Sequence, residues 1–165
     1  MDDLFMEKNL LLTTLRQLKR KQNIILEGAP GVGKTFVAKR LAHLIQGNTR
    51  NDTVVTVQFH QSYSYEDYIQ GLRPKKDGGF SIKNGTFYQL AKKAELSPKT
   101  PHFLIIDEIN RGNLSKIFGE LMMLIEADKR GSKHEVKLTY ADEDSPNFYV
   151  PKNLYIIGTM NTADK

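Results

Sequence analysis

The chain has 165 residues, of which 39% are hydrophobic, so it is long enough for one domain with a substantial core (residues 1–165) and too short for two ordinary domains. The lack of cysteine excludes disulfides and thiolate metal sites and favours a cytoplasmic location, and no apolar run approaches the roughly 18 residues that a membrane span needs. The formal net charge of +5 and a pI near 9.3 leave a nucleic-acid contact open.

Two helices and two strands are predicted in the first 60 residues. Leu11, Leu15 and Leu18 recur at helical spacing. The runs NIILEG and TVVTVQFH are apolar or β-branched, as strands require. The predicted elements are a helix over about residues 4–20, a strand at 23–28, a helix that Gly47 terminates and a strand at 53–60.

The middle of the chain carries a capping signal and a turn signal. Ser64, followed three residues later by Asp67, predicts the start of a short helix. The stretch FSIKNGTFY alternates around Asn84-Gly85, and because a type I′ turn needs positive φ at both central residues, this pair predicts the turn of a small β-hairpin. A helix over about residues 88–96 follows, and prolines end it.

The last third of the chain predicts two more strands around a helix. HFLIIDEI shows almost no alternation, which indicates a strand covered on both faces. Asn113 is expected to cap an apolar-sided helix, EVKLTY and NFYVP predict a second hairpin, and LYIIGTM predicts the fourth strand. Strands that alternate with helices predict a parallel sheet and therefore an α/β fold, here with two small β-hairpin inserts.

A glycine-rich motif follows the first strand and opens the next helix. GAPGVGKT matches G-x-x-x-x-G-K-[ST] in full, which predicts a phosphate-binding loop (P-loop). Lys34 is expected to contact the β and γ phosphates, and the Thr35 hydroxyl to bind Mg²⁺. The predicted nucleotide-binding residues are Gly28, Ala29, Pro30, Gly31, Val32, Gly33, Lys34, Thr35 and Phe36.

Two adjacent carboxylates end the third strand. Asp107 is expected to hold Mg²⁺, and Glu108 to orient and deprotonate the attacking water. Adjacent carboxylates are otherwise common in solvated turns, but together with the P-loop they favour hydrolysis over binding alone. No further metal is predicted, because the four histidines have no ligand spacing.

Two short basic runs are candidate DNA contacts. They are RQLKRK at residues 16–21 and RPKKD at residues 73–77. Runs of this kind also occur as solvated helix ends or loops, so both interpretations stay open.

Several stretches together resemble a known family. GAPGVGKTF, VQFHQSYSYEDYIQGLRP, IIDEINRGNLSKIFGELMMLIEADKRG and YVPKNLYIIGTMNTADK resemble the AAA+ GTPase domains of McrB-type subunits of modification-dependent restriction systems, over about residues 23–165. The first motif is common to many NTPases, whereas QFHQSYSYEDYIQG and MNTAD in this order are more selective. The MoxR and dynein-like AAA+ ATPases share DEINR with this chain but less of the other stretches.

The resemblance implies a role for the segment MNTAD. In the resembling sheet the last strand lies between the P-loop strand and the Asp107 strand, which implies that Asn161 lies near the γ-phosphate and acts with Glu108 and Lys34 in catalysis. Guanine-reading Asn-Lys-x-Asp motifs have lysine where this chain has Thr162, so the segment is interpreted as a water sensor. An asparagine that only caps a turn is the alternative.

Two further residues keep two interpretations each. Asp164 supports Asn161 or lies at a subunit interface. Arg111 faces a neighbouring subunit or forms a salt bridge at a helix start.

The resemblance also implies an architecture and an assembly. The implied architecture is the three-layer sandwich of a P-loop NTPase (AAA+), here truncated after the fourth core strand. Residues 1–165 would then be a partial nucleotide-binding core that lacks the lid, the fifth strand and the N-terminal DNA-reading domain. The implied assembly is a hexameric ring that works on DNA with an McrC-like endonuclease subunit. Because an arginine from the next subunit completes such sites, we expect the chain alone to bind Mg²⁺-nucleotide weakly and hydrolyse it negligibly.

The choice of nucleotide and of overall function keeps alternatives. The resemblance favours GTP over ATP as the bound nucleotide. A MoxR-like or dynein-like ATPase that remodels proteins, and a nucleotide-dependent assembly module without turnover, are the alternatives to a DNA-translocating motor.

Overall fold

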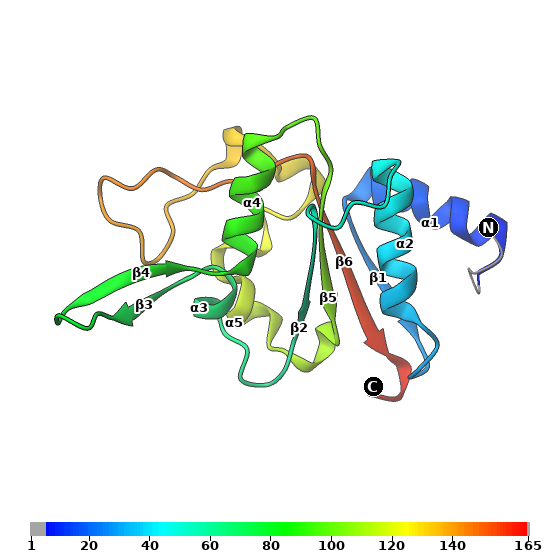
Figure 1. Cartoon of the computed structure of the whole chain (residues 1–165), viewed down its shortest axis with the longest axis horizontal. Helices are drawn as coiled ribbons and strands as arrows, with labels where there is room; N and C mark the ends of the chain where they lie inside the picture. Colours follow the sequence, from blue (N-terminus) through cyan, green and yellow to red (C-terminus); the bar gives the residue numbers. More distant parts are fainter. Residues whose placement is uncertain (1–5, 165) are drawn as a thin grey trace.

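The centre of the molecule is a four-stranded parallel sheet (Figure 1), seen in a computed structural model that describes residues 6–164. The strand order is β1-β6-β5-β2, and every neighbouring pair is parallel. The strands are β1 (Asn23–Gly28), β2 (Val54–Gln58), β5 (His102–Asp107) and β6 (Leu154–Asn161). The four predicted core strands and the α/β class are therefore confirmed, and β6 lies between β1 and β5 as the resemblance implied.

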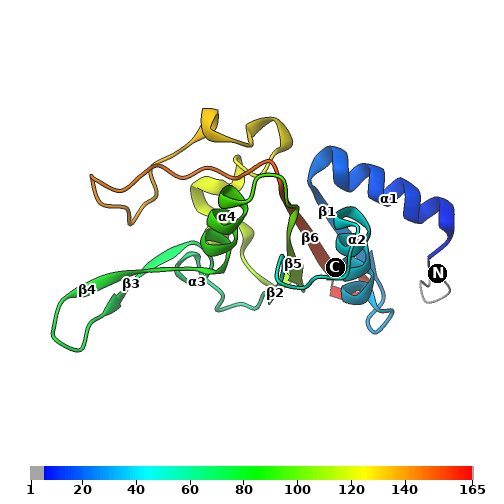
Figure 2. The ribbon, with the colours of Figure 1, turned by 45° about the horizontal axis from the view of Figure 1, so that its top comes forward.

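Helices cover both faces of the sheet, as Figure 2 shows from a second direction. They are α1 (Lys8–Lys21), α2 (Lys34–Gln46), α3 (Tyr65–Tyr68), α4 (Thr86–Leu96) and α5 (Leu114–Phe118). Short 3-10 turns are η1 (Ile109–Arg111), η2 (Gly119–Met122), η3 (Ala127–Lys129), η4 (Ser132–His134) and η5 (Thr162–Asp164). Within residues 6–164, no helix is long and apolar enough to cross a membrane.

Alternate side chains of the central strands enter two separate cores. Phe103 and Ile105 of β5 pack with α1 and α2, whereas Leu104 and Ile106 pack with α3, α4 and α5 on the other face. All four side chains are fully buried, and burial of each contributes about 1.5–3 kcal/mol. Two cores that share one sheet form the three-layer sandwich that the resemblance implied.

Local signals place the helix ends. The backbone of Gly47 has a φ of 73° and follows the last residue of α2, as predicted. The Ser64 side chain accepts from the Asp67 backbone while the Asp67 carboxylate accepts from the Ser64 backbone, so the predicted capping box is present at α3. Asn113 caps α5 through a bond from the Lys116 backbone of 3.1 Å.

The first predicted hairpin exists, but its predicted turn is wrong. The antiparallel strands are β3 (Gln70–Pro74) and β4 (Phe80–Asn84), and residues 75–79 form the turn. Asn84 ends β4, and Gly85 has a φ of −80° at the start of α4. A Cβ at Gly85 would lie 2.4 Å from the Tyr68 carbonyl carbon, so this glycine is used for close packing and not for a tight turn.

Of the second predicted hairpin, the antiparallel pairing is present but the two strands are not. The segments around Val136 and Phe148 form one isolated antiparallel bridge and no strands. They join a projecting segment, residues 135–148, that extends towards the same end of the molecule as β3 and β4 (Figures 1 and 2). The helix predicted after Asn113 is shorter than its apolar pattern, because Gly119 takes a φ of 52° and ends α5.

A buried guanidinium holds the ends of β1 and β6 that lie away from the P-loop. Arg130 is 3% exposed and donates to the Asn23 side chain (2.7 Å), the Pro151 carbonyl (3.2 Å) and the Ile125 carbonyl (2.8 Å). It also donates to the Leu154 carbonyl at the start of β6. Burial lowers the pKa of Arg130 to about 10, so the group remains charged at neutral pH.

Candidate active site

The P-loop connects the carboxyl end of β1 to the start of α2. Gly31 and Gly33 have φ values of 76° and 80°, which residues with a Cβ rarely adopt. No side chain caps the first turn of α2, which begins at Lys34. Its N–H groups and the positive end of the helix dipole therefore form the kind of site that binds phosphate.

The ammonium group of Lys34 lies inside this loop. Its Nζ donates to the carbonyl oxygens of Gly28 (3.1 Å) and Ala29 (2.7 Å) and to Oδ1 of Asn161 (2.8 Å). All three acceptors are neutral. A phosphate oxygen is anionic and is therefore a stronger acceptor for the Lys34 ammonium than any of these three.

A second bond extends this arrangement to Glu108. Asn161 is buried and donates from Nδ2 to Oε1 of Glu108 over 3.0 Å. The other carboxylate oxygen, Oε2, is buried and forms an ion pair with Nε of Arg111. The three predicted catalytic residues thus form one chain of hydrogen bonds, Lys34 to Asn161 to Glu108, and Arg111 closes its far end. The salt bridge that was one interpretation of Arg111 is therefore present, and the interpretation that Arg111 faces a neighbouring subunit stays a prediction.

The backbone of Glu108 is in the left-handed region. Its φ and ψ are 55° and 43°, and Glu108 and Gln22 are the two residues other than glycine with positive φ among those described. Such a conformation costs about 1–3 kcal/mol and clusters at functional sites. The Glu108 N–H donates to Oγ1 of Thr159 (3.4 Å), which helps to hold the side chain towards Asn161.

Thr35 and Asp107 bring two oxygen ligands together. The Thr35 hydroxyl lies 3.1 Å from Oδ1 of Asp107 and donates to it. A hydroxyl and a carboxylate side by side at a P-loop are donors of the kind that Mg²⁺ prefers, so these residues fit the ion. Sequence reasoning missed Thr159, whose buried hydroxyl donates to the same Asp107 oxygen. The only signal was a polar residue within the apolar strand β6.

A cavity of about 970 Å³ lies beside the P-loop. Its lining includes Gly31, Val32 and Lys34 together with Leu10 of α1 and Ile25 of β1. Its size is in the range of small-molecule sites, and its mixture of backbone and apolar side chains suits the sugar and base of a nucleotide.

The other residues considered in the sequence analysis are Phe36, His60 and Asp164. Phe36 is 44% exposed, and the Arg40 guanidinium lies 5.0 Å from its ring centroid. The His60 ring packs edge-on against Tyr63 and takes no part in the hydrogen-bond chain described above. The side chain of Asp164 lies outside the described part of the structure, so its predicted role stays a prediction. Within residues 6–164, no three His, Cys, Asp or Glu side chains form a metal-binding group.

Comparison with known proteins gives a family and includes relatives from restriction systems. The model of the AAA domain (dynein-related subfamily) matches residues 23–165. The chain is 56% identical over 165 residues to the Type IV methyl-directed restriction enzyme EcoKMcrB subunit of Escherichia coli strain K12, which covers 100% of this chain and 36% of that protein. It is 29% identical over 190 residues to the Type II restriction enzyme BsuMI component YdiS of Bacillus subtilis strain 168, covering 93% of this chain and 54% of that protein.

A solved structure agrees on the fold. The crystal structure of a protein from Cytophaga hutchinsonii, provisionally described as an ATPase, superposes with a TM-score of 0.54 and 19% identity, over 94% of this chain and 38% of that one. At this identity the likeness concerns the fold alone. The chain spans about a third to about half of the length of its two restriction-system relatives.

Proposed function

This chain belongs to the dynein-related subfamily of AAA domains, and on that premise we propose that it binds a nucleoside triphosphate with Mg²⁺ and hydrolyses its terminal phosphoanhydride bond. The observation that carries the proposal is the chain of bonds from Lys34 through Asn161 to Glu108. It joins the phosphate-binding loop to a carboxylate that can accept a proton.

Nucleotide binding is assigned to the P-loop, residues 28–35. The backbone N–H groups of the loop and the start of α2 contact the phosphates, and Lys34 exchanges its neutral acceptors for phosphate oxygens. Thr35 and Asp107 would hold Mg²⁺, which neutralises charge on the β and γ phosphates when bound.

Glu108 is assigned to the water. In the proposed reaction a water oxygen bonds to the γ-phosphorus, the bond to the β–γ bridging oxygen breaks, and Glu108 takes a proton from the water. Because Arg111 occupies Oε2, the water is expected at Oε1, the oxygen that Asn161 also contacts. Asn161 would then orient both the carboxylate and the water.

GTP is the proposed substrate, with ATP as the alternative. The preference rests on the likeness to McrB-type domains, which the 56% identity supports. No guanine-reading Asn-Lys-x-Asp motif is present, since Thr162 follows Asn161. The base would be read by the cavity beside the P-loop.

The larger function is proposed from the same likeness. The chain would act in the cytoplasm as part of a hexameric ring that translocates DNA and activates an McrC-like endonuclease subunit. Both restriction-system relatives support this context, although each is much longer than the chain. The dynein-related family assignment favours protein remodelling as the second candidate function.

Calorimetric titration of the 165-residue chain with Mg²⁺-GTP and Mg²⁺-ATP tests the proposal. We expect binding that Lys34→Ala weakens at least about 100-fold, because a charge-assisted contact to phosphate is lost. Lys39→Ala is the matched control, since Lys39 is an exposed lysine on the same helix. Equal affinities for wild type and Lys34→Ala would place the nucleotide elsewhere and overturn the proposal.

A further inference from the structure

The β3–β4 hairpin is a cationic projection that the proposed active site does not use. Its residues 70–84 include Arg73, Lys75, Lys76 and Lys83 against one acidic residue, Asp77. All of these side chains are exposed. The hairpin extends away from the sheet in Figures 1 and 2, so its charges project into solvent.

Strand register sorts the hairpin into two faces. Directly paired residues of antiparallel strands share a face, and Leu72 pairs with Ile82 and Pro74 with Phe80. These four residues form an apolar face, on which Leu72 is 47% and Phe80 is 67% exposed. Arg73 and Lys83 lie on the other face, and Lys75 and Lys76 occupy the tip. Phe80 pairs with Pro74, the residue directly before Lys75, so the exposed aromatic ring lies at the same end of the hairpin as the two lysines of the tip.

The base of the hairpin is firmly held. Gly85 donates from its backbone to the Ile69 carbonyl (2.7 Å), and the Gln70 side chain donates to Asn84 (3.1 Å). At the tip, Gly78 and Gly79 have φ values of 92° and 77°, which permit the tight turn. The hairpin thus presents its charges on an ordered element, which reduces the entropy cost of binding.

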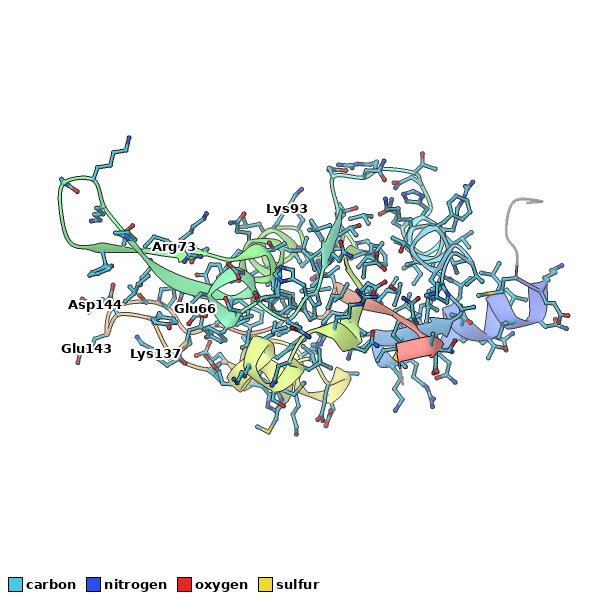
Figure 3. All side chains as sticks on the ribbon, turned by 90° about the horizontal axis from the view of Figure 1, so that it is seen from below. Glu66, Arg73, Lys93, Lys137, Glu143 and Asp144 are labelled. Atoms are coloured by element: carbon cyan, nitrogen blue, oxygen red, sulfur yellow. The ribbon has the colours of Figure 1, made fainter. Side chains whose placement is uncertain are left out.

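Within residues 6–164, little of the positive charge of the hairpin is neutralised. Arg73 lies 3.3 Å from Asp67, but both side chains are about half exposed, so water screens the pair. Figure 3 shows Arg73 on the hairpin and Glu143 and Asp144 on the projecting segment 135–148, at the same end of the molecule. Lys137 donates to the main-chain carbonyls of Glu143 (2.7 Å) and Ser145 (3.0 Å), which holds this acidic segment in place.

We propose that the β3–β4 hairpin is a contact site for single-stranded nucleic acid. Lys75 and Lys76 at the tip and Lys83 nearer the base contact phosphates of a strand that follows the hairpin, and the exposed ring of Phe80 stacks on an unpaired base. Acidic residues 142–144 repel phosphates and restrict the strand to a path along the hairpin. The site deepens the proposed DNA-dependent function and rests on it for its biological meaning, whereas the binding itself follows from charge and exposure.

The test measures fluorescence anisotropy of a labelled single strand of about 20 nucleotides and of the matching duplex, at about 50 and 200 mM salt. No nucleotide is added, so the result does not depend on the active site. The variant Lys75→Gln/Lys76→Gln/Lys83→Gln should lose at least about tenfold in single-strand affinity, and its salt slope should fall by about 2. The comparison variant is Lys19→Gln/Arg20→Gln/Lys21→Gln, which removes the same charge from the other basic run, at the exposed end of α1, and should retain affinity if the hairpin is the contact site.

Two further variants distinguish stacking from charge. Phe80→Ala should lose about fivefold or more in single-strand affinity while duplex affinity stays unchanged, and Phe80→Tyr should restore the loss. Asp142→Asn/Glu143→Gln/Asp144→Asn should strengthen binding, most at low salt. Circular dichroism and Mg²⁺-nucleotide titration on each variant verify the fold and the nucleotide site.

Three outcomes would overturn the proposal. They are equal losses in the two cationic triple variants, an unchanged affinity in the hairpin variant, and no nucleic-acid binding by wild type at either salt concentration. If any of these outcomes is found while nucleotide binding is intact, the hairpin proposal is refuted and the proposed nucleotide site is not affected. Loss of nucleotide binding in Lys34→Ala with intact nucleic-acid binding would leave the hairpin site standing independently.

Discussion

Asn161 donates its side-chain amide to Glu108 over 3.0 Å, although 53 positions separate the two residues in the sequence. The direction of this bond is determined by Lys34, whose ammonium can only donate and which occupies the amide oxygen of Asn161. The amide nitrogen must therefore face Glu108. A movement of Lys34 on phosphate binding would therefore change the position of Asn161, and through it the hydrogen bond to the Glu108 carboxylate that we assign to the water.

Glu108→Gln should separate binding from chemistry. Glutamine keeps the size of the side chain but cannot accept a proton at neutral pH, so nucleotide affinity should stay within about threefold while turnover falls at least about 100-fold. Phosphate release is measured in the assembly that gives wild-type turnover, with Glu126→Gln as an exposed control. Turnover at the parental rate would remove Glu108 from the mechanism.

Removal of divalent cations should affect wild type more than Asp107→Asn. If Thr35 and Asp107 hold Mg²⁺, chelation should weaken nucleotide binding by wild type at least about tenfold. Asp107→Asn should bind weakly from the start and respond little to the chelator. Asp128→Asn, at an exposed position, serves as the control. An equal chelator response in Asp107→Asn and wild type would argue against this ion site.

Arg130→Met should destabilise the fold by about 3 kcal/mol in urea unfolding. The substitution leaves three main-chain carbonyls and the Asn23 side chain without their buried donor. Arg130→Lys should rescue little, because one ammonium group cannot reach the same set of acceptors. The exposed control Lys133→Met should stay within about 0.5 kcal/mol of wild type. A similar stability for Arg130→Met would show that these acceptors find water.

Stability should fall on mild acidification through His102. Burial lowers the pKa of this imidazole below its ordinary value and Lys93 lowers it further, whereas its hydrogen bond to the Thr100 carbonyl and the charge of Asp52 only partly oppose this. The unfolded state then binds more protons than the native state as the pH falls below about 6.5, so the free energy of unfolding decreases there. His102→Gln should show a smaller decrease between about pH 7.5 and 5.5 in urea unfolding. Parallel curves for the two proteins would contradict the assignment.

The four core strands could be predicted because their signals are local. A buried parallel strand needs a run of apolar or β-branched residues, and NIILEG and HFLIID meet that need without knowledge of the rest of the chain. The α/β class follows from their alternation with helices. The P-loop could be predicted for the same reason, since its whole conformation is encoded within eight consecutive residues, 28–35.

The hairpin turn could not be predicted locally. Asn84-Gly85 is a strong turn signal, but Gly85 is needed where the backbone approaches Tyr68 too closely for a Cβ. The turn was taken instead by the stretch that contains Gly78 and Gly79. Tertiary packing therefore outweighed the local preference of Asn84-Gly85 for a turn.

The part of the site that was missed depends on strand order and not on any motif. Thr159 contacts Asp107 because β6 lies beside β5, and a single threonine in an apolar strand does not stand out in the sequence. Arg111 was named from the sequence with a salt bridge as one interpretation, but its partner Glu108 is identified by the sharp turn through a left-handed residue. Asn161 was found through the family resemblance, since an asparagine after an apolar run is also a common turn cap.

The register between β1 and β6 determines how Asn161 is placed relative to the P-loop. Gly28 lies opposite Asn161, and at the far end Arg130 bonds to both Asn23 of β1 and Leu154 of β6. A slip of one residue between these strands would move Asn161 by about 3.3 Å and turn its side chain to the opposite face of the sheet. The site therefore does not allow a shift of even one residue between β1 and β6. Arg130, at the opposite end of the sheet, helps to hold the strand register on which the catalytic groups depend.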